Sequence, residues 1–188
     1  MGACRLQVAD AQLPTGAMPH HFQDASPVFK AISGANQPAT NLFWTKAALR
    51  YVAETGDVAW LTRRMPTIER AMAFLLATLG AAPEPTLIRT EGALFVDVLR
   101  RGNYSAETNA FAVHVLGLVA DAWEFVGNRS MASDARAAAA AIGEALNTWL
   151  WSVDHFVTQR NLDNSTRDFV DYDANLLAGV NTQCEHTV

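Results

Sequence analysis

The sequence predicts an all-α fold made of antiparallel helical hairpins, and three observations lead to this prediction. Apolar residues recur at helical spacing in several segments of the 188-residue chain. The dipeptides Gly56-Asp57 and Gly127-Asn128 each separate two such segments with almost no loop between them. Long connections then join one pair of segments to the next. Because tight turns make neighbouring helices antiparallel, we expect stacked hairpins in a superhelix or a closed toroid, with an ordinary helical bundle as the alternative.

The composition is that of a globular chain and excludes several classes of protein. A hydrophobic content of 50% with five Trp and nine Phe excludes intrinsic disorder. A net charge of −5 without any long basic run disfavours a nucleic-acid binder. The first residues lack the apolar region of a signal peptide, and no apolar run reaches the ~20 residues that span a bilayer. We therefore expect a soluble, cytoplasmic protein with no nucleic-acid or membrane partner.

The chain divides into an irregular N-terminal arm, residues 1–38, and a helical domain, residues 39–188. Proline and glycine punctuate the arm, which has no periodic pattern. An arm of this length is unusual in a compact domain unless it covers something. Thr40 is the expected cap of the first helix, whose apolar stripe is followed by a terminating Gly56.

The second helix is expected to follow directly from Asp57, with Pro66 in the first turn of its main part. A long connection over 80–104 then leads to the third helix. The apolar stripes of the third and fourth helices run over 111–126 and 131–149, and a connection over 151–172 leads to a fifth helix near Asp173.

Parallel stacking of these hairpins would bring the N-termini of the first, third and fifth helices to one rim. Both long connections must reach that rim, and long loops on a rigid scaffold commonly carry function. The residues expected there are carboxylates, amides and aromatics, which together suit a carbohydrate, because hydroxyls need donors and acceptors and a sugar ring stacks on an aromatic face. They are Gln37, Asn41, Trp44, Asp97, Tyr104, Glu107, Asn109, Asp171, Asp173 and Asn175.

Asp97 is the candidate general acid. It is a lone acid within an apolar run, and a carboxyl in apolar surroundings tends towards a raised pKa, which suits proton donation. The alternative is an ion pair with Arg100 or Arg101. Other candidates also have structural alternatives: Asp173 as a helix N-cap, Glu107 as a first-turn residue favoured by the helix dipole, and Trp44 as part of the core.

Three segments of the chain carry a recognisable pattern: residues 41–57, which end in Thr-Gly-Asp, the motif Phe95-Val96-Asp97 with Glu107-Thr-Asn-Ala ten residues later, and residues 171–178. Together they resemble the six-hairpin (α/α)6 toroid glycosidases, the superfamily of glycogen-debranching glucosidases and α-L-rhamnosidases. The resemblance covers roughly residues 36–180. It implies that an aromatic-x-Asp motif supplies Asp97 as the general acid, although family members typically carry a Trp nearer the acid where this chain has Phe95.

A closed toroid needs about twelve helices, whereas this chain supplies about five, so the resemblance implies part of a catalytic domain. We expect a glycoside hydrolase that acts with inversion on a carbohydrate substrate, with Asp97 and Glu107 as catalytic residues. No cofactor or metal is implied, except that Asp171 and Asp173 could bind calcium. The alternatives are a non-catalytic helical module that binds a glycan or a partner protein, a half-toroid that self-associates or needs another chain, and a sugar epimerase, for which only His114 is suitably placed.

Overall fold

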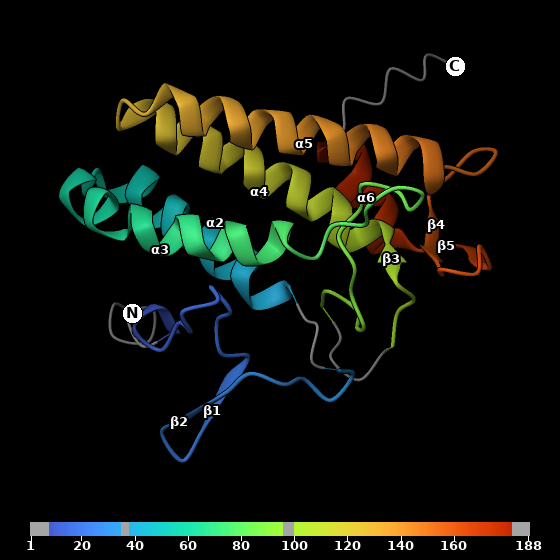
Figure 1. Cartoon of the computed structure of the whole chain (residues 1–188), viewed down its shortest axis with the longest axis horizontal. Helices are drawn as coiled ribbons and strands as arrows, with labels where there is room; N and C mark the ends of the chain where they lie inside the picture. Colours follow the sequence, from blue (N-terminus) through green and yellow to red (C-terminus); the bar gives the residue numbers. More distant parts are fainter. Residues whose placement is uncertain (1–7, 35–37, 96–99, 182–188) are drawn as a thin grey trace.

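The computed structural model describes residues 8–34, 38–95 and 100–181. Within them the chain folds into the predicted helical hairpins (Figure 1). The helices are α2 (Ala39–Thr55), α3 (Val58–Leu76), α4 (Ala106–Phe125), α5 (Arg129–Trp149) and α6 (Tyr172–Asn181). The two helices of each hairpin, α2 with α3 and α4 with α5, run antiparallel, and α6 packs against α4.

The two tight turns are as predicted. Gly56 ends α2 in the left-handed region with φ 69°, and the Asp57 carboxylate accepts a hydrogen bond from the backbone N–H of Trp60 at 2.9 Å. The Asn128 side chain caps α5 in the same way.

Two expected boundaries are wrong. Helix α2 begins at Ala39 after Pro38, which makes no side-chain cap, so Thr40 lies inside the helix. Pro66 lies in the interior of α3, because the Asp57 cap starts that helix two turns earlier. The side chains of Leu61 and Met65, which precede Pro66 in the helix, are already buried in the core.

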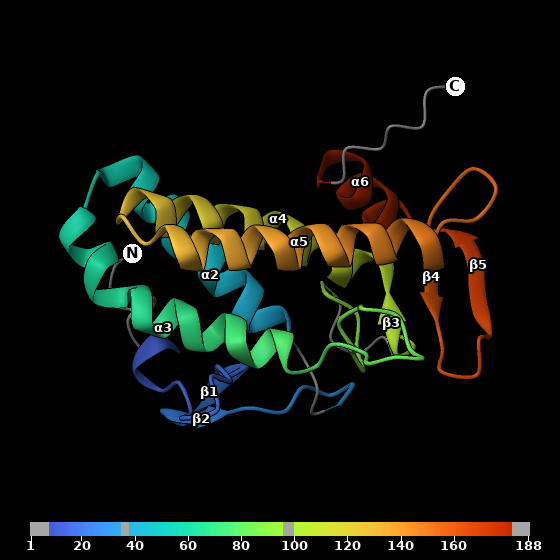
Figure 2. The ribbon, with the colours of Figure 1, turned by 45° about the horizontal axis from the view of Figure 1, so that its top comes forward.

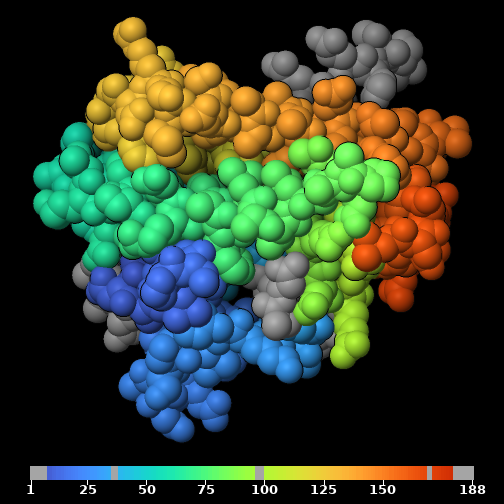
Figure 3. Space-filling model, viewed as in Figure 1, coloured from blue at the N-terminus to red at the C-terminus, as the bar shows by residue number. Residues whose placement is uncertain are grey.

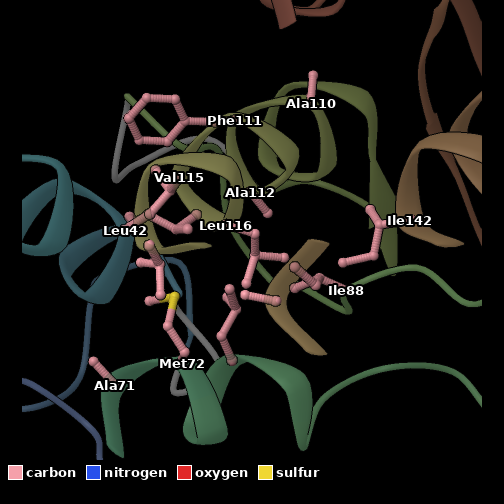
Figure 4. Close-up of a cluster of buried hydrophobic side chains, with 14 of the residues drawn as sticks. Leu42, Ala71, Met72, Ile88, Ala110, Phe111, Ala112, Val115, Leu116 and Ile142 are labelled. Atoms are coloured by element: carbon pink, nitrogen blue, oxygen red, sulfur yellow. The ribbon is translucent and has the colours of Figure 1, made fainter. Parts of the chain in front are cut away.

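Helix α4 lies at the centre of the structure and packs against α5, α6 and α2. Its apolar residues meet those of α2, α3 and α5 in one core, where Leu42, Met72, Ile88, Leu116 and Ile142 are all buried (Figure 4). Burying each such side chain contributes about 1.5–3 kcal/mol. Within the described part of the chain, no helix is long and apolar enough to cross a membrane.

The all-α prediction holds only in part, because both long connections contain short antiparallel strands. Strands β3 (Tyr104–Ser105), β4 (Val157–Arg160) and β5 (Thr166–Val170) form a three-stranded sheet in that order. The pairing of β3 with β4 joins residues far apart in the sequence, and both strands are too short to show an alternating pattern.

The first part of the described N-terminal arm lies against α3, through contacts of Asp10 and Gln12 with Arg64 and Thr67 (Figure 3). Its Ala9 and Met18 are buried in the core, and Arg64 of α3 forms an ion pair with Asp10. The arm is not wholly irregular. A hairpin of β1 (His21–Gln23) and β2 (Ser26–Val28) turns through two residues with positive φ, Asp24 and Ala25.

Candidate functional site

The two long connections meet at one end of the helices, beside the start of α4. Tyr104 of β3 pairs with Arg160 of β4, and Ser105 pairs with Gln159. Figure 2 shows β3, β4 and β5 together at that end. Because α4 begins at Ala106 and α6 at Tyr172, directly after β3 and β5, the N-termini of the third and fifth predicted helices lie together at this end, which we call the rim.

A buried ion network links the two connections at this rim. Arg101 donates from Nη2 to Asp171 Oδ2 at 2.7 Å and from Nε to Glu107 Oε1 at 3.4 Å. The exposed fraction is 11% for the Arg101 side chain, 2% for Glu107 and 10% for Asp171. The expected convergence of Glu107 and Asp171 is therefore observed, and Arg101 is the group that makes it possible by offsetting two close negative charges.

Glu107 holds both flanks of the segment that contains Asp97. Its Oε1 accepts a hydrogen bond from the backbone N–H of Leu94 at 2.7 Å on one side and faces the Arg101 guanidinium on the other. Burial raises the pKa of Glu107, while the Leu94 N–H and the Arg101 charge lower it and Asp171 raises it further. Asp97 itself lies outside the described residues, as does Gln37.

Asp171 also starts helix α6. Its Oδ1 accepts hydrogen bonds from the backbone N–H groups of Asp173 at 3.1 Å and Ala174 at 3.3 Å. Asp171 is thus the cap that was suggested for Asp173, and the Asp173 side chain is exposed at the rim. Among the described residues, no group of three or more His, Cys, Asp and Glu could hold a metal ion.

Two of the candidate asparagines hold the main chain of the long connections. Asn109 accepts from the Ile88 N–H at 2.7 Å and donates to the Ile88 carbonyl at 3.2 Å. Asn175 makes the same pair of bonds to Phe156, at 2.8 and 3.1 Å. Both also donate to the carbonyl four residues before them, at Ser105 and Asp171.

Asn41 does the same for the N-terminal arm. Its side chain accepts from the Met18 N–H at 3.1 Å and donates to the carbonyls of Gly16 and Ala71 at 2.9 and 3.1 Å. We call Asn41, Asn109 and Asn175 the asparagine clamps. The side-chain amides of all three residues are occupied by hydrogen bonds to the main chain. Their expected contact with substrate stays a prediction, and these hydrogen bonds do not support it.

The aromatic candidates are also enclosed. Trp44 is 7% exposed and belongs to the core, which was the alternative to its role in sugar stacking. Tyr104 is 2% exposed and donates its hydroxyl hydrogen bond to the Glu84 carboxylate, which also pairs with Arg89. Burial and Glu84 raise the pKa of Tyr104, against the lowering effect of Arg89. Substrate stacking on either ring stays a prediction.

A polar cavity of about 570 Å³ opens at the rim beside the ion network. We call it the rim cavity. The arm supplies Lys30 and residues 32–34, the first connection supplies 90–91 and 100–103, and the second connection supplies Asn161. Arg101 is therefore both part of the buried network and part of the wall. The arrangement of cations, carboxylate and backbone groups around this space suits a ligand rich in hydroxyl groups.

Sequence reasoning missed Arg101, which it considered only as a partner of Asp97. The signal was weak, because an Arg-Arg pair in a loop is usually a solvated surface feature. Only the convergence of two acids from separate connections would have indicated a buried cation between them.

We expect Asn109→Ala to lower the free energy of unfolding by about 2–3 kcal/mol, because the buried N–H and carbonyl of Ile88 both lose their partner. The same change at Asn128, an exposed helix cap, should cost about 1 kcal/mol. Urea unfolding of both variants makes the comparison. Equal losses would contradict the structural role of Asn109.

Comparisons with known proteins support the fold but not a particular activity. No protein-family model and no curated protein matches the sequence. A crystal structure of a GH78 family rhamnosidase of Bacillus sp. GL1 is similar, with a TM-score of 0.77 and 18% identity over 94% of this chain. A rhamnosidase from Klebsiella oxytoca with rhamnose bound has a TM-score of 0.68 and 12% identity over 93% of this chain.

This chain spans only 18% and 33% of the lengths of those two proteins. At such low identity, the likeness concerns the arrangement of the backbone. The helical hairpins and their connections therefore have a fold similar to that of one part of these two rhamnosidases.

Proposed function

We propose that this chain is part of the catalytic domain of a glycoside hydrolase of the six-hairpin (α/α)6 toroid type. Asp97 is the general acid that protonates the leaving oxygen, and hydrolysis proceeds with inversion. The observation that carries the proposal is that Glu107 bonds to both sides of the segment that contains Asp97. It accepts a hydrogen bond from the Leu94 N–H on one side and forms an ion pair with Arg101 on the other. A catalytic acid must be held in place, because a small displacement from the reacting oxygen is costly in rate.

Within this proposal Glu107 is a positioning residue. Its carboxylate is almost fully enclosed and already bonded to the chain, so it acts through the loop that it holds. The exposed Asp173 and the walls of the rim cavity are the better candidates for contact with sugar hydroxyls. The second carboxylate and the remaining hairpins of the toroid would come from outside this chain.

The test is hydrolysis by the full-length protein of a panel of 4-nitrophenyl glycosides that includes the α-L-rhamnoside. We expect release of nitrophenol from at least one member, and proton NMR of the first-formed sugar should show the inverted anomer. A protein that binds members of the panel without turning over any of them would contradict the proposal.

One observation favours the non-catalytic alternative, a helical module that binds a glycan or a partner protein. A groove of about 570 Å³ lies between α2 and α4 near their tight turns, and its walls are largely apolar. Phe125 at its edge is 65% exposed. Apolar surfaces of this kind often mark interfaces. Size-exclusion chromatography distinguishes the hydrolase from the non-catalytic module. A protein that stays monomeric at all concentrations would count against the module, whose apolar groove should promote association.

A further inference from the structure

A second, smaller cavity lies between the first connection and the β4–β5 hairpin. Its volume is about 220 Å³, and we call it the hairpin cavity. Apolar side chains form much of its wall, and polar groups reach it from Glu84, Tyr104 and Arg160. The apolar and amide residues that complete the wall are Pro83, Pro85, Trp149, Leu162, Asn161 and Asn164. The space is smaller than a site for a drug-sized molecule and fits a ligand the size of one sugar ring.

Arg160 is the unusual member of this wall. Its guanidinium lies over the Trp149 ring, 5.8 Å from the centroid, and its Nε is buried. Within residues 8–34, 38–95 and 100–181, this Nε has no hydrogen-bond partner, and the guanidinium forms no ion pair with a carboxylate. A guanidinium has five donors in a rigid fork, and a partly buried one is normally paired.

The other charges around the hairpin cavity are already balanced. The Glu84 carboxylate pairs with Arg89 and accepts from the Tyr104 hydroxyl, and both partners lower the pKa of Glu84. Among the described residues of the wall, Arg160 is the charged side chain that has no partner of opposite charge. A planar guanidinium is best matched by a carboxylate, which it can bind through two parallel hydrogen bonds.

From this geometry we propose that the hairpin cavity binds a small carboxylate-bearing ligand with a body the size of a sugar ring. The carboxylate pairs with Arg160, and the body lies against Trp149 and the prolines. The proposal is independent of the glycosidase proposal, because it uses no residue of the Asp97 loop or the Glu107 network.

The test uses D-glucuronate as the probe and D-glucose as its neutral counterpart, since the two differ only in the carboxylate. Each is titrated into the ¹⁵N-labelled full-length protein, and the indole N–H of Trp149 and the Nε–H of Arg160 are followed by NMR. We expect saturable shifts of both signals with glucuronate, and binding of glucose at least about tenfold weaker, as loss of one charge-assisted pair implies. Equal binding of the two sugars, or shifts with neither, would overturn the proposal.

Two variants locate the effect. Arg160→Gln should abolish the glucuronate-induced shift at Trp149, whereas Arg167→Gln on the neighbouring strand β5, where the side chain is exposed, should leave it unchanged. Retention of the shift in Arg160→Gln would also overturn the proposal. Because the wild-type comparison of glucuronate with glucose needs no variant, it remains decisive even if Arg160→Gln fails to fold.

Discussion

Asp97→Asn in the full-length protein is expected to lower turnover of a responsive glycoside by about 10²-fold or more, because the amide cannot donate the proton that the leaving oxygen requires. Asparagine has nearly the size of aspartate, and the bonds from Glu107 to Leu94 and Arg101 do not involve position 97. The loss should therefore come from chemistry rather than from unfolding.

Leaving-group dependence sharpens this test. A good leaving group such as 2,4-dinitrophenol needs little protonation, so its glycoside should lose much less rate than one with a poor leaving group. The matched control is Asp134→Asn, an exposed acid on α5, which should keep wild-type turnover. If Asp97→Asn stays within a fewfold of wild type on every substrate, Asp97 is not the general acid.

Arg101→Met should lower the free energy of unfolding by about 3–5 kcal/mol, the usual cost of removing one partner from a buried ion pair. Methionine fills much of the space but leaves Glu107 and Asp171 without the cation between them. Urea unfolding of wild type and variant measures the difference.

Two further variants give this result its meaning. Arg50→Met breaks an ion pair with Glu54 whose side chains are 76% and 62% exposed, and it should cost less than about 1 kcal/mol. Adding Glu107→Gln to Arg101→Met removes one of the uncompensated charges and should recover part of the lost stability. A loss in Arg101→Met no larger than that in Arg50→Met would show that the network is not an energetic centre of the fold.

The helices and tight turns could be predicted because their signals lie within a few residues of one another. Gly56 followed by Asp57 provides both a left-handed terminator and the next cap, and the structure uses both. The strands could not be predicted in the same way. Tyr104 is selected for β3 by pairing with Arg160, a partner that no local pattern reveals.

For the candidate site, the predicted topology gave the positions of the residues more reliably than their roles. Hairpin stacking was enough to place Glu107 and Asp171 at one rim. It could not distinguish an amide that contacts a ligand from one such as Asn109, which pairs with the backbone of Ile88, because both need a polar residue in the first turn of a helix. That distinction depends on the path of the preceding connection, which only the folded chain defines.

The asparagine clamps define where this fold can be divided. Each clamp ties the first turn of α2, α4 or α6 to an extended segment that precedes it in the chain. A transplantable unit therefore consists of a hairpin together with its preceding connection, and a chimera cut between them would lose the clamp. The bonds from the clamps to these preceding segments do not cross Gly56 or Gly127, and an added Cβ at either glycine would have no non-neighbouring atom within 4 Å. Circular permutants and insertions should accordingly be tolerated at these two turns and resisted at the opposite rim.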